Sequence, residues 1–171
     1  MRRALCAVFA VLLAGSARGA AVTWTGGDSG DWNVAGNWSP AGVPGAFDAV
    51  TIPSGTVVAY STDPALGVAS LTLGEAGITP VAVLQLSTGL AVGGTLLLQE
   101  GAALQVSTGA GVAAADMFLL RGTSVAFTAA PAVTGTAPFL RLYASGSFYL
   151  AGGSTITVRG RGYAAGAGAA A

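Results

Sequence analysis

Leu84–Gly89 reads LQLSTG, and Leu104–Gly109, twenty residues later, reads LQVSTG. Five of the six positions are identical, and the sixth exchanges Leu for Val. A weaker echo, VAFT at Val125–Thr128, follows about one period further along. A repeat of this length fits one coil of a parallel β-helix, in which each coil adds two or three short strands to the coil before it. A β-propeller blade needs about twice that length, and a β-sandwich does not repeat one hexapeptide in register.

Short apolar segments recur along the rest of the chain, and each lies between Gly, Pro, Ser or Thr residues. Segments bounded in this way are typical of strands, whereas no capped helical pattern continues for two turns. The predicted strands are Ala49–Ile52, Thr56–Tyr60, Ser70–Leu73, Val83–Leu86, Thr95–Leu98, Leu104–Ser107, Met117–Leu120, Ser124–Phe127, Phe139–Tyr143, Ser147–Leu150 and Ser154–Val158. We therefore predict an all-β parallel β-helix with about 20 residues per coil; a β-sandwich is the alternative.

The composition suits such a solenoid. Strands of neighbouring coils lie about 4.8 Å apart and pair their backbone groups, so inward side chains stack in columns. The chain has 27 glycines, which fit tight turns between strands. Only 8% of its residues are charged, and a coil stack needs few charges because its stability is a sum over neighbouring coils.

Residues 1–20 have the layout of a secretory signal peptide. Arg2 and Arg3 precede an apolar run of eleven residues, Ala4–Ala14, and small residues follow it. The run is far shorter than the roughly 20 residues of a membrane-spanning helix. We expect cleavage between Ala17 and Val22, an exported chain and no membrane span afterwards. A short membrane anchor that stays in place is the alternative.

Removal of this segment changes the charge and the chemistry of the chain. Four arginines then face seven acidic residues, with no lysine and no histidine, so the mature chain is acidic. Cys6, the only cysteine, leaves with the signal peptide, so we expect no disulfide, no zinc site and no cofactor. Arg159–Tyr163 (RGRGY) is similar to arginine–glycine tracts that bind RNA. Two arginines on an acidic chain are too few for phosphate binding, however, so no nucleic-acid partner is predicted.

The segment 21–46 lacks the repeat and contains all three tryptophans, Trp24, Trp32 and Trp38. It precedes the first predicted strand, where the open end of a coil stack needs cover. We interpret it as a cap in which each indole buries about 200 Å², and in which Asp31 and Asn37 hold tight turns through hydrogen bonds to the backbone. The alternative is a glycan contact, with indole faces stacked on a sugar ring and Asp31 and Asn37 bound to its hydroxyl groups.

The coils are expected to span residues 47–158. Residues 159–171 (RGRGYAAGAGAAA) carry no apolar pattern, and we expect a flexible Gly/Ala-rich tail. The sequence indicates no cap at this end. Two hypotheses follow: the chain is a fragment of a longer protein, or its last coil makes an end-to-end contact with a partner.

The segment Trp24–Ile52 resembles the opening module of large exported bacterial β-helical surface proteins of the autotransporter-adhesin type. The positions that carry this resemblance are Trp24, Gly26, Gly27, Gly30, Asp31, Trp32, Asn37, Trp38, Val43, Pro44, Asp48, Val50 and Ile52. Leu90–Val106 (LAVGGTLLLQEGAALQV) is similar to the generic coil of these proteins, LxVxGTLxLxxGAxLxV. The resemblance implies a right-handed parallel β-helix, a secreted or cell-surface location, and surface glycans or other cell-surface proteins as partners.

Acidic residues offer few catalytic or metal-binding arrangements. A glycosidase needs two carboxyl groups roughly 5–10 Å apart. Glu100 and Asp116 are a weak candidate pair, because we expect neighbouring coils to bring them close, but no third group supports them. Serine-based hydrolysis would need a histidine and a Gly-x-Ser-x-Gly turn, and the chain has neither. A calcium site would use Asp28, Asp31 and Asp48, yet their spacing matches no calcium loop, so no metal site is predicted. We therefore predict a non-catalytic structural or adhesive module; a glycan-binding or polysaccharide-degrading β-helix protein is the alternative.

Overall fold

The computed structural model describes residues 19–61, 66–78, 81–107, 111–128 and 140–157. Within these ranges the fold is all-β, with one 3-10 turn, η1 (Ala35–Asn37), as its helical element. The strands form two sheets, and the pairing of β1 with β3 is the one antiparallel pairing among those described. The predicted all-β class with parallel strand pairing is confirmed.

The larger sheet has nine described strands in the order β13-β11-β9-β7-β4-β1-β3, with β14 also paired to β11 and β6 to β9. Their bounds are β1 (Ala21–Trp24), β3 (Trp38–Ser39), β4 (Ala49–Ile52), β6 (Leu66–Val68), β7 (Ser70–Leu73), β9 (Leu90–Leu98), β11 (Gly111–Leu119), β13 (Arg141–Ala144) and β14 (Phe148–Leu150).

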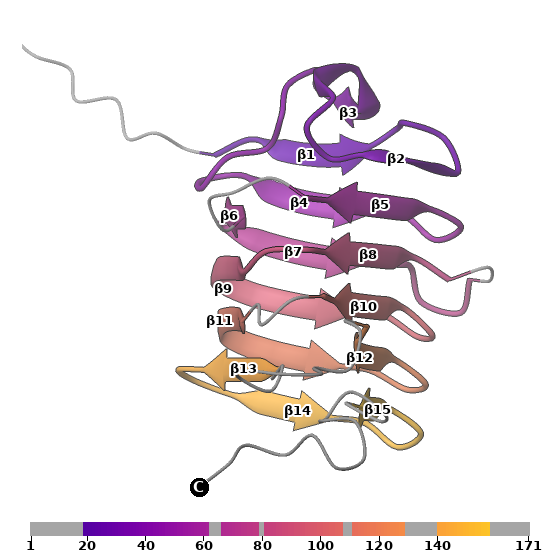
Figure 1. The fold of residues 1–171 in the computed structure, drawn as a ribbon, viewed down its shortest axis with the longest axis vertical. Coiled ribbons are helices and arrows are strands. Elements are labelled where there is room, and N and C mark those ends of the chain that lie inside the picture. Colours follow the sequence, from indigo (N-terminus) through magenta and orange to yellow (C-terminus); the bar gives the residue numbers. More distant parts are fainter. Residues whose placement is uncertain (1–18, 62–65, 79–80, 108–110, 129–139, 158–171) are drawn as a thin grey trace, which may run out of the picture.

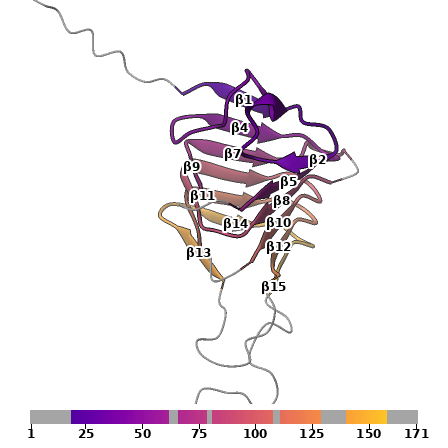
Figure 2. The ribbon, with the colours of Figure 1, turned by 45° about the horizontal axis from the view of Figure 1, so that its top comes forward.

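The smaller sheet has six described strands in the order β15-β12-β10-β8-β5-β2. Their bounds are β2 (Ser29–Asp31), β5 (Val57–Tyr60), β8 (Val83–Leu86), β10 (Ala103–Val106), β12 (Ser124–Phe127) and β15 (Thr155–Thr157). A strand of the larger sheet is repeatedly followed by one of the smaller sheet, as in β4–β5, β7–β8, β9–β10, β11–β12 and β14–β15. We call each of these a strand pair. Figure 1 shows them stacked in sequence order, and Figure 2 shows the two sheets as two columns of strands.

The repeated hexapeptides lie side by side. Leu84 in β8 and Leu104 in β10 are direct partners on adjacent parallel strands, and the following residues pair in the same register. The prediction that identical hexapeptides become neighbours in space is therefore confirmed. A β-sandwich, which would place them on facing antiparallel sheets, does not fit this pairing.

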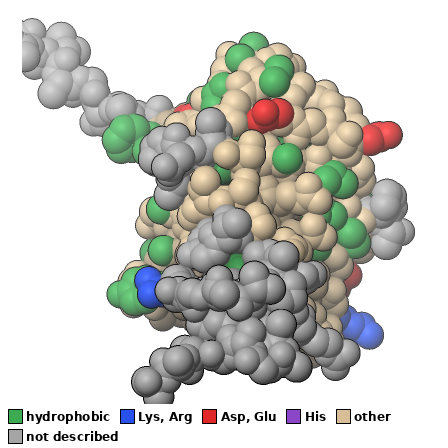
Figure 3. Space-filling model, viewed as in Figure 1, with side chains coloured by type: hydrophobic (Ala, Val, Ile, Leu, Met, Phe, Trp, Pro, Cys, Tyr) green, Lys and Arg blue, Asp and Glu red, His purple; other side chains and the backbone are tan. Residues whose placement is uncertain are grey.

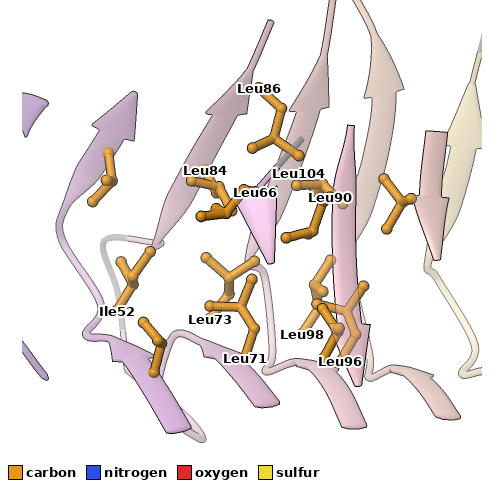
Figure 4. Close-up of a cluster of buried hydrophobic side chains, with 14 of the residues drawn as sticks. Ile52, Leu66, Leu71, Leu73, Leu84, Leu86, Leu90, Leu96, Leu98 and Leu104 are labelled. Atoms are coloured by element: carbon orange, nitrogen blue, oxygen red, sulfur yellow. The ribbon is translucent and has the colours of Figure 1, made fainter. Parts of the chain in front are cut away.

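The core fills the space between the two sheets. Burial alternates along each central strand, so that β8 and β10 each bury their second and fourth residues. Because the strands pair in register, the buried residues form columns that run through the stack, such as Val58, Leu84, Leu104 and Val125. Figure 4 shows the leucines of both sheets pointing into this shared interior.

The strands extend further than the sequence predicts. The expectation that the first strand begins at Ala49 is wrong, because β1 and β2 precede it and pair with β4 and β5. β6 was not predicted, and β9 begins at Leu90 instead of Thr95. Gly93 and Gly94 indicate a turn in the sequence, but the backbone N–H of Gly94 donates to the carbonyl of Ala69 at 2.7 Å, which keeps this segment in the sheet.

Two sequence predictions concern residues outside the described ranges: all but the last two residues of the signal peptide at 1–20, and the tail at 159–171. Among the residues that the structure describes, no helix has the length and apolar character needed to cross a bilayer.

Candidate functional site

The three tryptophans form one buried cluster at the N-terminal end of the stack. Trp24 ends β1 and Trp38 begins β3, and the two are direct partners in the antiparallel pairing. Their ring centroids lie 5.0 Å apart in an edge-to-face arrangement. Trp32 packs against Trp38 at 4.6 Å and against Tyr60 at 6.1 Å, so the cluster continues into the core between the sheets.

Burial of these rings leaves no indole face for a ligand. Trp24 and Trp38 are each 2% exposed, and Trp32 is 0% exposed. A sugar stacks on an aromatic ring only where the face of that ring is open. The geometry therefore supports the cap interpretation of the three tryptophans over the glycan contact.

Polar side chains of this segment bind its own backbone. Asp31 Oδ1 accepts from the backbone N–H of Asn33 at 2.8 Å, as in an Asx turn. Asn37 Nδ2 donates to the carbonyl of Asp31 at 3.0 Å. Asp48 accepts from the N–H of Ala20 and of Gly45, each at 2.8 Å. These bonds fix the path of the chain from β1 to β4, as the sequence predicts for Asp31 and Asn37.

Glu100 and Asp116 do not share a row of the stack. Asp116 pairs with Thr95, whereas Leu98 pairs with Leu119, and Glu100 lies two residues beyond Leu98. The three residues from Thr95 to Leu98 span about 10 Å of strand, so Glu100 lies in the turn past the end of β9, whereas Asp116 lies beside the interior of that strand. Asp116 Oδ1 accepts from the N–H of Ser147 at 2.7 Å, which holds the chain that leads into β14. The expected approach of these two carboxylates is therefore not seen.

Within the described part of the chain, no group of three His, Cys, Asp or Glu side chains comes together. Asp31 and Asp48 bind backbone N–H groups, as given above. Asp28 is exposed in the turn before β2, where its carbonyl accepts from Val57.

A pocket lies on the outer side of the smaller sheet, at the ends of β5, β8, β10 and β12. Its volume is about 310 Å³, and its lining is Ala59, Tyr60, Ser61, Gln85, Leu86, Ser87, Gln105, Ser107 and Thr128. Among these described residues none carries a formal charge at neutral pH. On the face drawn in Figure 3, charged side chains are few and scattered.

None of the pocket residues is among the predicted site residues, although the repeat contains a signal for them. Gln85 and Ser87 in the first hexapeptide correspond to Gln105 and Ser107 in the second. Once the hexapeptides are adjacent, every outward polar residue within them is also repeated in space.

The C-terminal end of the stack differs from the N-terminal end. Phe148, Leu150 and Ile156 pair with the buried residues Met117, Leu119 and Val125, yet they are 45%, 46% and 41% exposed. Their positions in the columns are interior positions, but no further described strand pair covers them.

In comparisons with known proteins, no family model, no curated protein and no solved structure matches this chain.

Proposed function

We propose that this protein is an exported, non-catalytic module of the bacterial cell exterior, built as a right-handed parallel β-helix and used as a structural spacer or adhesive surface. The observation that carries the proposal is the in-register parallel stacking of the strand pairs, with Leu84 beside Leu104. A stack of this kind extends in one direction and presents long outer faces, which suits a spacer or a broad contact surface.

The covered N-terminal edge of the larger sheet supports the same role. The antiparallel strand β3 pairs with the outer edge of β1, and Trp38 of β3 belongs to the buried tryptophan cluster. An uncovered edge strand invites association with other chains, so a protein released outside the cell benefits from such a cap.

Carboxylate placement favours the non-catalytic hypothesis over polysaccharide degradation. Stacking is expected to bring Glu100 and Asp116 together, but Glu100 lies in the turn after β9, whereas Asp116 pairs with Thr95 inside that strand. The resemblance of Trp24–Ile52 to the opening of autotransporter-type surface proteins supports the cell-surface location.

The proposal includes an end-to-end contact with a second copy of this chain. The apolar side chains of Phe148, Leu150 and Ile156 are exposed at the C-terminal end, whereas β3 blocks the opposite edge of the larger sheet. The exposed apolar positions lie at the C-terminal end, so the proposed contact joins the C-terminal ends of two copies, which gives a two-fold contact between like ends and not a filament.

One experiment tests whether the protein is exported. The full reading frame with a C-terminal tag is expressed in a bacterial host, and the protein is located by fractionation and by protease accessibility on intact cells. We expect an N-terminus between Ala17 and Val22 and an exported product. A matched variant, Val8→Arg, interrupts the apolar run and should remain inside with Met1 or Arg2 at its N-terminus. An intracellular, uncleaved wild-type protein would refute the proposal.

A further inference from the structure

The outer face of the smaller sheet carries two hydrogen-bonded glutamines, Gln85 and Gln105, which we call the amide pair. The neighbouring strand on each side has an alanine in the same row. Ala59, Gln85, Gln105 and Ala126 are direct partners on four adjacent strands and share the outward side of the sheet. Gln85 Nε2 donates to Gln105 Oε1 at 3.1 Å. Because alanine flanks the pair on both sides, Gln85 Oε1 and Gln105 Nε2 have no further partner among the residues described here. The pair therefore offers one acceptor and one donor to a ligand.

A row of hydroxyl groups runs beside the amide pair. Ser61, Ser87, Ser107 and Thr128 each follow the last residue of β5, β8, β10 and β12, which pair in register. The hydroxyls of Ser87, Ser107 and Thr128 donate to the carbonyls of Tyr60, Leu86 and Val106 in the strand before. These bonds fix the hydroxyl oxygens in a line whose spacing is the strand separation, about 4.8 Å.

The two rows together line the pocket of about 310 Å³ described above. This volume lies at the lower end of the range for small-ligand sites, about 300–1,000 Å³. Its lining offers amide and hydroxyl groups, with no carboxylate and no arginine among the described residues. Charged ligands need a partner of opposite charge when water is displaced, so the chemistry of the lining favours an uncharged ligand with many hydroxyl groups.

We propose that this groove, formed by the amide pair and the hydroxyl row, binds a neutral polysaccharide chain that lies across the strands. A polysaccharide presents the same hydroxyl groups once per sugar unit along its length. The groove presents its hydroxyl row once per strand. Several equivalent hydrogen bonds can then form along one ligand. The inference rests on the proposed adhesive role, because it names the ligand class of that surface.

Affinity electrophoresis of the purified protein tests the groove. Gels contain dextran, mannan, galactan or a soluble cellulose derivative as neutral polymers, and polygalacturonate or heparin as anionic ones. We expect retardation by at least one neutral polymer, and a tenfold or greater increase in the apparent Kd for Gln85→Ala/Gln105→Ala. The matched control is Thr51→Ala/Thr72→Ala, which changes two paired residues of the larger sheet and should bind as the wild type does.

A second variant changes the same pocket at a different residue, so that the result does not depend on correct folding of the double variant alone. Ala59→Gln keeps both glutamines and fills the end of the pocket, so it should also raise the apparent Kd tenfold or more. The inference is overturned if no neutral polymer retards the wild type, if only anionic polymers do, or if the two groove variants bind as the control does. A protein that is exported but binds no neutral polymer would refute the groove and leave the spacer role standing.

Discussion

At the residue scale, the buried tryptophans differ in how their N–H groups are satisfied. Trp24 Nε1 donates to the carbonyl of Gly27 at 3.0 Å, and Trp38 Nε1 donates to the carbonyl of Trp32 at 2.7 Å. Trp32 Nε1 is buried and has no hydrogen-bond partner in the part of the chain described. A buried polar group without a partner costs about 1–3 kcal/mol, so Trp32 contributes through the packing of its ring.

Phenylalanine substitutions separate these contributions. Trp38→Phe removes a buried donor and leaves the carbonyl of Trp32 without that bond, whereas Trp32→Phe removes an N–H that has no partner. Both lose a similar ring volume, so we expect Trp38→Phe to lower the free energy of unfolding by about 1–3 kcal/mol more than Trp32→Phe. Urea denaturation followed by circular dichroism measures the difference. Equal losses would show that the Trp38 hydrogen bond contributes little.

At the scale of elements, the turns between the two sheets repeat one backbone feature, a glycine with a positive φ angle. Gly101, Gly122 and Gly153 lie in the turns of successive strand pairs with φ of 76°, 71° and 80°. A side chain in this left-handed region costs about 1–2 kcal/mol. The glycines therefore let the chain cross from one sheet to the other at the same place in each strand pair.

Gly122→Ala tests whether the positive φ angle of these turns requires glycine. A Cβ at this position would have its nearest neighbour at 3.9 Å, so the cost comes from backbone conformation and not from a clash. We expect a loss of about 1–2 kcal/mol in the free energy of unfolding. Gly36→Ala is the control, because a Cβ there meets nothing within 4 Å and its φ is not in the left-handed region. Thermal melting of both variants gives the comparison, and matching melting temperatures would contradict the expectation.

The columns of the core give a second test at this scale. Leu104 is 0% exposed between Leu84 and Val125, so Leu104→Ala should cost about 2–5 kcal/mol. Thr72→Ala, at an outward position of β7, should cost less than about 1 kcal/mol. Guanidinium denaturation of the two variants is the measurement. A small loss for Leu104→Ala would mean that this column is not the core.

At the scale of the whole molecule, stability should decrease toward the C-terminal end. A stacked fold gains its stability from neighbouring units, and β14 and β15 have described neighbours on one side only. Their interior positions remain exposed at Phe148, Leu150 and Ile156. β8 and β10 lie between two neighbours each.

Hydrogen–deuterium exchange resolved by mass spectrometry measures this gradient. We expect amides of β14 and β15 to exchange at least tenfold faster than those of β8 and β10, because local opening at an end breaks fewer contacts. The experiment is run at several protein concentrations. Protection of β14 that rises with concentration would support the proposed end-to-end contact, whereas uniform protection along the stack would contradict the gradient.

The sequence by itself determined the stacking of the repeat. Hexapeptides twenty residues apart predicted that Leu84 and Leu104 become neighbours. Gly, Pro, Ser and Thr residues around the short apolar segments predicted most of the strands, because these boundary signals are local properties of the chain. The strands of the N-terminal segment were missed because β1 and β2 are short, and their pairing with β4 and β5 depends on residues far along the chain. Tertiary structure alone decided between the cap and the glycan contact for the tryptophans, and it alone decided that Glu100 lies past the end of β9 while Asp116 pairs with Thr95. It also decided that Gln85 and Gln105 line one pocket with three serines. These are consequences of register, since a shift of one residue between strands would turn every side chain to the opposite face.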